Sequence, residues 1–463
     1  MAEIKPNYGI ILLSLVILLA IYAIPAPDGL SMEGKNALGI FIVAILLWTT
    51  NAIPLSVTGL LVIALLPLLN VMPSKDAFAL FGNQAVFFIM GAFILAAAMM
   101  KTGISKRAAL VMLNIFDGTP RRLLFSVMLS SALLSFIMPE HAVAAMMFPV
   151  VAAIADSLDL EPLNSKYGTL LFLSMAWGTI IGGVGTLLGG ARNPLAIGLL
   201  EENSGMTISF FEWCQAIVPI VFVMLAIGFI ILNLFFKIDI HDVRSARSVL
   251  KRHLKRMGKI SINEKKAGLI FVLTVLAWIF FGHIIGLAVI AVISGVSLFI
   301  LDIITWDDVE SNVNWGIILM YGGAISMGSA LVQTGAVEWI ANTVLYNGYP
   351  NAFFTLIIIS LVAKFLTEGI SNSAAVAILL PIGFSLGSII GINPIAMTYM
   401  VSVPAGLAFI LPMGTPANAI AYSSGYYEIK EVLVPGLILN LISWIVFILM
   451  ALIYWPLIGI SLT

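Results

Sequence analysis

Runs of about 20 apolar residues recur along the 463-residue chain, from YGIILLSLVILLAIYAI near its start to LILNLISWIVFILMALIYWPLIGI at its end. A helix needs about 20 mostly apolar residues to cross the hydrocarbon core of a bilayer. Only 10% of the residues are charged, against about 25% in an average soluble domain. The sequence therefore predicts an all-α polytopic membrane protein with about ten or eleven spans.

The positive charges indicate an orientation. Residues 101–122 carry five Lys and Arg, and residues 237–266 carry ten more. Both loops are predicted to be cytoplasmic by the positive-inside rule, and counting spans then places the N-terminus in the cytoplasm of a cell-membrane protein. The first apolar run has no small-residue cleavage site and is expected to be retained. The segment VRSARSVLKRHLKR is predicted to be amphipathic and to lie on the cytoplasmic leaflet.

Two halves of the chain resemble each other. IMGAFILAAAMMKTG aligns with YGGAISMGSALVQTG, so that Gly91 and Gly323 are 232 residues apart. The same offset pairs PEHAVAAMMFP with SNSAAVAILLP, and GGARN matches GTPAN at an offset of 225. Fixed offsets over three segments predict an internal repeat. The predicted division is an N-terminal helix in residues 1–35, a first repeat in 36–236, a basic linker in 237–266 and a second repeat in 267–463.

The loop after Gly103 is predicted to be cytoplasmic, whereas the loop after Gly335 is predicted to be outside, so the two repeats should be inverted. Inverted repeats are typical of secondary carriers, which bind their substrate near the middle of the membrane between discontinuous helices. An anion channel can also contain such repeats, and it would be recognised by currents far above the turnover of a carrier.

Each half carries two apolar runs that are interrupted by Gly, Pro, Ser, Thr and Asn. They are residues 135–141, 182–194, 367–373 and 412–418. Irregular backbone at membrane depth must be buried in protein or line a wet cavity, so the four segments should meet. Half-helices that start at Asn372 or Ala417 would direct N–H groups at an anion, and free oxygens beside them would suit sodium.

These segments resemble the divalent anion:sodium symporter family. TEGISNSAAVAILLP and MGTPANAIAYSSG match the family's second-half pattern, and MPEHAVAAMMFP and GGVGTLLGGARNP match its first-half frame. The resemblance implies about 11 transmembrane helices plus two re-entrant hairpins, sodium-coupled uptake of a small divalent anion such as a C4-type dicarboxylate, and a homodimer. Sulfate or monocarboxylate transport, exchange, and proton or no cation coupling at the first half are the alternatives.

The resemblance also implies site residues. The second-half sodium site would use the side chains of Thr367 and Asn372 and the backbone oxygens of Ile370 and Gly414. The substrate carboxylate would face Asn372, Ser373, Thr415 and Pro416. Ser135 and Gly189 keep the frame of a first-half sodium site.

The first half departs from the family pattern at its ligand positions. Pro139-Glu140-His141 stands where the family has Ser-Asn-Thr, and Ala191-Arg192 follows Gly190 where prolines are usual. Our hypothesis is that Arg192 supplies permanently the positive charge that sodium supplies elsewhere, with Glu140 as its counter-ion. Glu140 tuned by His141 as a proton carrier is the rival, and a purely structural knot of these side chains is the third reading.

Other classes of protein fit the sequence poorly. No HExxH motif is present, and Ser373 with His141 is the one pairing that could be offered for an intramembrane enzyme, so no enzyme is predicted. The expected partners are a small anion and membrane lipid, without nucleic acid, and sodium is the expected coupling ion in place of an organic cofactor. Lys364 and Glu368, four residues apart, are predicted to pair on one helix.

Overall fold

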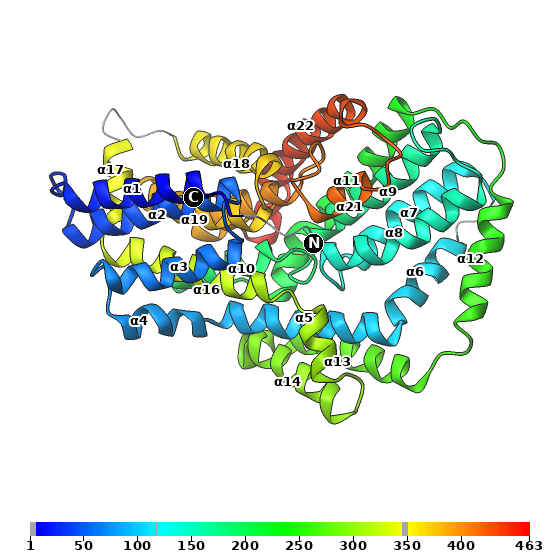
Figure 1. Cartoon of the computed structure of the whole chain (residues 1–463), viewed down its shortest axis with the longest axis horizontal. Helices are drawn as coiled ribbons and strands as arrows, with labels where there is room; N and C mark the ends of the chain where they lie inside the picture. Colours follow the sequence, from blue (N-terminus) through cyan, green and yellow to red (C-terminus); the bar gives the residue numbers. More distant parts are fainter. Residues whose placement is uncertain (1–5, 116–117, 345–350) are drawn as a thin grey trace.

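The computed structural model describes residues 6–115, 118–344 and 351–463, and every regular element in these ranges is a helix (Figure 1). Nine helical segments among them are long and apolar enough to cross a membrane. Three shorter apolar helices, Tyr8–Ala23, Leu55–Leu68 and Leu287–Ile300, accompany them. The prediction of an all-α polytopic membrane protein is confirmed.

The helices fall into two series joined by one basic helix. The first series is α1 (Tyr8–Ala23), α2 (Met32–Thr50), α3 (Leu55–Leu68), α4 (Ser74–Ala79), η1 (Leu80–Gly82), α5 (Gln84–Thr102), α6 (Ile104–Ile115), α7 (Pro120–Leu134), α8 (Glu140–Ser157), α9 (Lys166–Gly183), α10 (Arg192–Ser204) and α11 (Phe210–Phe235). The joining helix is α12 (Arg244–Arg256). The second series is α13 (Ile262–Ile285), α14 (Leu287–Ile300), α15 (Trp306–Asn312), α16 (Trp315–Gln333), α17 (Ala336–Val344), α18 (Ala352–Gly369), α19 (Asn372–Ile390), α20 (Pro394–Ser402), η2 (Pro404–Gly406), α21 (Pro416–Tyr422), α22 (Ile429–Ile453) and η3 (Trp455–Ile458).

The order of the helices is compatible with the predicted repeat. α7 and α18 begin at Pro120 and Ala352, and α8 and α19 begin at Glu140 and Asn372, both pairs 232 residues apart. From α2 to α11 and from α13 to α22 the elements follow one another in the same sequence of long and short helices. The inverted sense of the two series and the cytoplasmic N-terminus stay predictions.

Two close helix crossings repeat in the same way. A β-carbon built on Gly323 of α16 would lie 2.4 Å from the α-carbon of Gly59 in α3. One built on Gly91 of α5 would lie 2.7 Å from the β-carbon of Ala291 in α14. Gly59 and Ala291 are themselves 232 residues apart. Small residues thus let the backbones touch at both crossings, as in many membrane helix pairs.

The predicted domain boundaries differ from the observed helix starts. The border at residues 35 and 36 falls inside α2, because the Ser31 hydroxyl caps this helix by accepting from the N–H of Gly34 at 2.9 Å. The border at 266 and 267 falls inside α13, which begins earlier because Ser261 and Glu264 form a capping box. Parts of the predicted segment 1–35, of the first basic loop and of the loop after Gly335 lie outside the described residues, at 1–5, 116–117 and 345–350.

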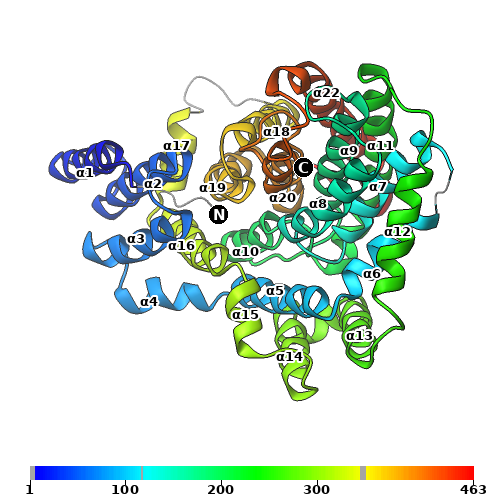
Figure 2. The same ribbon diagram turned by 45° about the vertical axis from the view of Figure 1, so that its right-hand side comes forward.

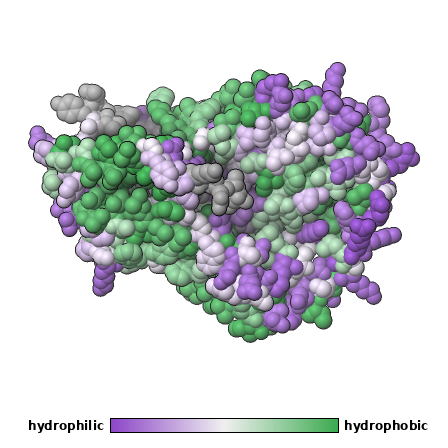
Figure 3. Space-filling view, viewed as in Figure 1, coloured by the Kyte–Doolittle hydropathy of each residue, from purple (hydrophilic) through white to green (hydrophobic). Residues whose placement is uncertain are grey.

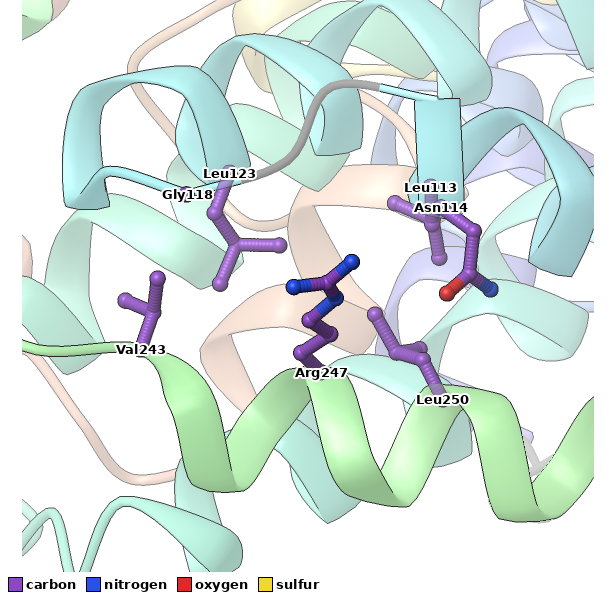
Figure 4. A pocket seen from close by; sticks show the side chains of 7 residues that line it. All are labelled: Leu113, Asn114, Gly118, Leu123, Val243, Arg247 and Leu250. Atoms are coloured by element: carbon purple, nitrogen blue, oxygen red, sulfur yellow. The ribbon is translucent and has the colours of Figure 1, made fainter.

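The basic helix α12 lies against protein and not against lipid alone. It packs along α6 and α8, with Ala246 and Leu250 buried in that contact (Figure 2). Arg247 extends from α12 between Leu113 and Leu123 (Figure 4). Hydrophilic residues gather at the end of the molecule where α12 lies, while hydrophobic surface covers α1–α3 (Figure 3). The hypothesis that the apolar face of this segment rests on the leaflet is therefore wrong, because α6 and α8 already cover that face.

Candidate functional site

Four interruptions of the helices lie where the sequence places Gly, Pro and Asn. The chain leaves helical conformation at residues 135–139, between α7 and α8, and at 184–191, between α9 and α10. In the second half it does so at 370–371, between α18 and α19, and at 407–415, before α21. The last of these ends three residues before the predicted one, because Thr415 caps α21 and Pro416 occupies its first turn, where a proline needs no N–H partner. α21 therefore begins at Pro416 and not at Ala417.

Each half-helix that follows an interruption packs on the opposite half. α10 of the first half contacts α19 and α20 of the second, and Figure 2 shows it beside α19. α21 of the second half contacts α8 and α9 of the first. This exchange brings the four interruptions together, as the sequence predicts from the cost of unpaired backbone at membrane depth.

Two asparagines that the sequence analysis did not select hold the long interruptions in shape. Asn193 Nδ2 donates to the carbonyl oxygens of Gly183 (3.2 Å) and Thr186 (2.7 Å), and Asn418 Nδ2 donates to those of Ala408 (3.0 Å) and Leu411 (3.3 Å). Every residue of the second set follows its counterpart by 225 positions. The alignment of GGARN with GTPAN contains both asparagines and could have identified them.

Lys364 and Glu368 bind the interruption at 407–415 and not each other. The Glu368 carboxylate accepts three successive backbone N–H groups, those of residues 409–411, at 2.8 to 3.2 Å, and the side-chain amide of Asn440 at 2.5 Å. The Lys364 ammonium donates to the Leu407 carbonyl and lies 4.9 Å from the centre of the Phe409 ring. Both buried charges thus satisfy unwound backbone, so the prediction of a pair on one helix is wrong.

The side-chain amide of Asn372 lies among oxygen atoms at the start of α19. One end of the amide is 2.8 Å from the Gly414 carbonyl oxygen, 3.2 Å from that of Ala405 and 2.6 Å from the Thr367 hydroxyl. With its nitrogen at this end, the amide donates to these oxygens, and its oxygen accepts from Arg192 Nη1 at 3.1 Å. Carbonyl, hydroxyl and amide oxygens are the ligands that a hard cation such as sodium prefers. We call the group formed by Thr367, Asn372, Ala405 and Gly414 the oxygen cage.

Arg192 and Glu140 form a buried ion pair beside the oxygen cage. Arg192 Nη1 lies 2.6 Å from Glu140 Oε1, and the two residues are only 2% and 5% exposed. The backbone N–H of Glu140 donates to the Gly189 carbonyl at 2.9 Å, which joins the two first-half interruptions. Arg192 Nε and Nη2 have no hydrogen-bond partner within the described chain. The guanidinium therefore keeps donors available for an anionic oxygen.

Glycines on both sides make room for the guanidinium. A β-carbon on Gly190 would lie 2.6 Å from Arg192 Nη1, and one on Gly406 would lie 2.2 Å from Arg192 Nε. A β-carbon on Gly183 would lie 2.2 Å from Glu140 Oε1. Gly406 belongs to the second half, so the guanidinium occupies the junction of the two halves. Any side chain larger than hydrogen at Gly406 would have to displace it.

The remaining predicted site residues have the following positions. The Ser135 hydroxyl is buried without a partner in the described structure, and its carbonyl oxygen is 2.3 Å from where a β-carbon on Gly189 would lie. Ile370 is buried at the end of α18. Ser373, like Asn372, is 8% exposed. These residues border the ion pair and the oxygen cage on their own halves.

Three further predicted residues lie differently from the rest. The Thr415 hydroxyl accepts from the N–H of Asn418 at 3.1 Å and so caps α21, and Pro416 is exposed. His141 is half-buried and stacks edge-on against Phe93, with ring centres 5.9 Å apart. His141 is therefore placed against α5, whereas Glu140 pairs with Arg192. A closed knot of all three ionisable side chains is not what the structure shows.

Known proteins similar to this chain are membrane transporters. The family described as "Sodium:sulfate symporter transmembrane region" matches residues 7–461. A protein of Staphylococcus saprophyticus named "Sodium-dependent dicarboxylate transporter SdcS" is 29% identical over 466 residues, which cover 94% of this chain and 89% of that protein. A Staphylococcus aureus protein of the same name is 29% identical over 458 residues, covering 93% and 88%.

Two solved transporter structures share the fold. MtrF of Neisseria gonorrhoeae, described with a class of antimetabolite efflux pumps, has a TM-score of 0.56 at 14% identity, and the alignment covers 100% of this chain and 97% of that one. The YdaH transporter of Alcanivorax borkumensis has a TM-score of 0.56 at 14% identity, covering 98% of each chain. At such low identity the likeness shows the fold alone.

Proposed function

The chain belongs to the sodium:sulfate symporter family, whose members are membrane transporters and not enzymes, and from this premise we propose that it couples the entry of sodium to the uptake of a small divalent anion. The anion we propose is a C4-type dicarboxylate, since the relatives that match most of the chain are named dicarboxylate transporters. Transport proceeds by alternating access around a site between the two halves.

One observation carries this proposal. The oxygen cage and the Arg192 guanidinium lie on opposite sides of a single amide, that of Asn372, with 3.1 Å between the amide and Arg192 Nη1. A cation in the cage and an anion on the guanidinium would therefore be held side by side. Each would lower the electrostatic cost of burying the other, which is what cotransport of the two requires.

The two halves differ in their ability to hold sodium. In the first half, Gly189, which occupies the position of Gly414, already accepts a hydrogen bond from the N–H of Glu140. Arg192 brings a tethered positive charge to the same place. We propose that the second half binds the coupling sodium, and that Arg192 takes the part of a first-half cation with Glu140 as its counter-ion.

Uptake into proteoliposomes tests the function. Labelled succinate should accumulate when a sodium gradient is imposed and should not accumulate with potassium in its place. Thr367→Val removes one oxygen of the cage at nearly constant volume and should raise the sodium concentration required about tenfold. Citrate, sulfate and lactate define the substrate class. Equal uptake of succinate in sodium and potassium would contradict sodium coupling, and uptake only against internal succinate would indicate exchange.

A proton on Glu140 is the second candidate for coupling in the first half, because this buried carboxylate accepts from a single side chain, Arg192. Glu140→Gln separates the two roles in a measurement of succinate uptake across pH. If Glu140 serves as counter-ion, we expect the variant to lose about tenfold or more in succinate affinity at every pH, because the amide leaves the guanidinium without a compensating charge. Intact uptake that has lost its pH dependence would instead identify a proton carrier.

A further inference from the structure

The Asn372 amide has chemically different ends, and its two neighbourhoods demand opposite ones. Toward the oxygen cage it faces only acceptors when no cation is present, so its nitrogen belongs there. Toward Arg192 it faces a donor, so its oxygen belongs there. Both demands are met at once by a single orientation, with the nitrogen 2.6 to 3.2 Å from the three cage oxygens and the oxygen 3.1 Å from Nη1.

A cation in the oxygen cage reverses the first demand. Sodium is bound by oxygen and repelled by an amide NH2 group, so the Asn372 oxygen must face the cage for this residue to act as a ligand. The amide nitrogen then faces Arg192. Two groups of donors, the NH2 of Asn372 and the guanidinium, are left pointing into the same space, where Arg192 Nε and Nη2 already have no partner in the described structure.

We propose that the Asn372 amide is a two-position switch which couples the oxygen cage to Arg192. This proposal rests on the sodium-coupled anion transport proposed above and assigns its residues. In the cation-free protein the amide oxygen occupies Arg192 and the amide nitrogen fills the cage. Sodium turns the amide, which releases Nη1 and creates a row of donors that a carboxylate oxygen of the substrate satisfies.

The switch explains why the two ligands favour each other. Sodium binding must break a charge-assisted hydrogen bond between Arg192 and Asn372, and the anion replaces that bond. Allosteric coupling of two sites typically changes affinity by about 5- to 150-fold and acts equally in both directions. We expect sodium to increase succinate affinity by about tenfold or more, and succinate to increase sodium affinity by the same factor.

The decisive test measures sodium affinity without anion. Glu140→Gln combined with Arg192→Gln removes the ion pair at constant net charge, and the amide no longer has to leave a guanidinium. Sodium, titrated calorimetrically in the full-length purified protein, should bind this double variant about tenfold more tightly than wild type. The result runs against intuition, because residues on the substrate side are removed and ion binding improves.

A thermodynamic cycle separates the switch from direct electrostatics. Asn372→Asp carries an oxygen at both ends, so it can face the cage and Arg192 together without turning. In this background the removal of the ion pair should leave sodium affinity within about twofold of its value before removal, apart from the direct field, which is common to both backgrounds. An equal change of sodium affinity with Asn372 intact and with Asn372→Asp would overturn the switch.

A second variant keeps the test open if the double variant fails to fold. Gly406→Ala displaces the guanidinium while retaining its charge, and it should also tighten sodium binding in the absence of anion. Gly369→Ala, at a glycine with no atom within 4 Å of its added carbon, is the matched control and should bind sodium as wild type does. Unchanged sodium affinity in Gly406→Ala would count against the switch.

The proposed function and the switch fail in different ways. If sodium does not change succinate affinity in the wild-type protein, sodium-coupled transport itself is wrong. If the wild type shows the mutual enhancement but the cycle shows no dependence on Asn372, the function stands and the switch is wrong. Potassium at equal concentration replaces sodium in every titration without cation.

Discussion

Replacing Arg192 by glutamine will abolish dicarboxylate uptake and destabilise the protein. The substitution leaves the Glu140 carboxylate buried, at 5% exposure, without the guanidinium that now lies 2.6 Å away. Breaking a buried ion pair by removing one partner costs about 3–5 kcal/mol, because the remaining charge is uncompensated. We therefore expect a fall in thermal midpoint, measured by tryptophan fluorescence, together with a loss of succinate binding of about 100-fold or more.

The double variant Glu140→Gln with Arg192→Gln separates the two effects. Both charges are gone, so thermal stability should return close to that of wild type, since neutral replacement of a buried pair is often harmless. Uptake should stay low because no cation faces the anion in the first half. Wild-type uptake by Arg192→Gln alone would show that the pair is structural and that the anion binds elsewhere.

The second large effect is expected at Gly406, where an added methyl group would collide with the guanidinium. The β-carbon of Gly406→Ala would lie 2.2 Å from Nε and 2.4 Å from Nη2 of Arg192, closer than such atoms approach in proteins. Overpacking of this kind costs about 1–3 kcal/mol. A shift of a binding group by about 1 Å can cost about 100-fold in rate, so uptake should fall by that order.

Gly369→Ala is the control for this prediction, because it adds the same methyl group to open space at the end of α18. Its uptake and thermal midpoint should stay near those of wild type. If Gly406→Ala transports as well as Gly369→Ala, the guanidinium must be able to move aside without loss of function. That result would weaken the assignment of Arg192 to the substrate.

The positions of the helix interruptions were predictable from composition. Gly, Pro, Ser and Asn inside apolar runs mark them in all four cases, and the start of α19 at Asn372 agrees with the prediction. The resemblance to the symporter family is confirmed by a match over residues 7–461. The contact between Arg192 and Glu140 also follows from sequence reasoning, because two buried opposite charges on neighbouring breaks have strong cause to meet.

Contacts between the halves could not be obtained in this way. Lys364 and Glu368 were expected to pair because helical spacing considers one helix alone, whereas the unwound backbone at 407–411 offers both charges better partners. The apolar side of α12 was assigned to lipid because its sequence does not reveal α6 and α8. The approach of Arg192 to Asn372 depends on α10 packing on the opposite half, which no local pattern encodes.

The crossed packing of α10 and α21 has a consequence for how the protein is made. When the ribosome has completed the first half, α10 has no α19 or α20 to rest on, and α8 and α9 still lack α21. A nascent chain therefore holds a charged half-helix in the membrane until nearly its last 50 residues have been synthesised, from Pro416 onward. Truncated chains should be recognised by membrane quality control as unassembled. Two separately expressed halves should regain the pocket only when they are produced in the same cell.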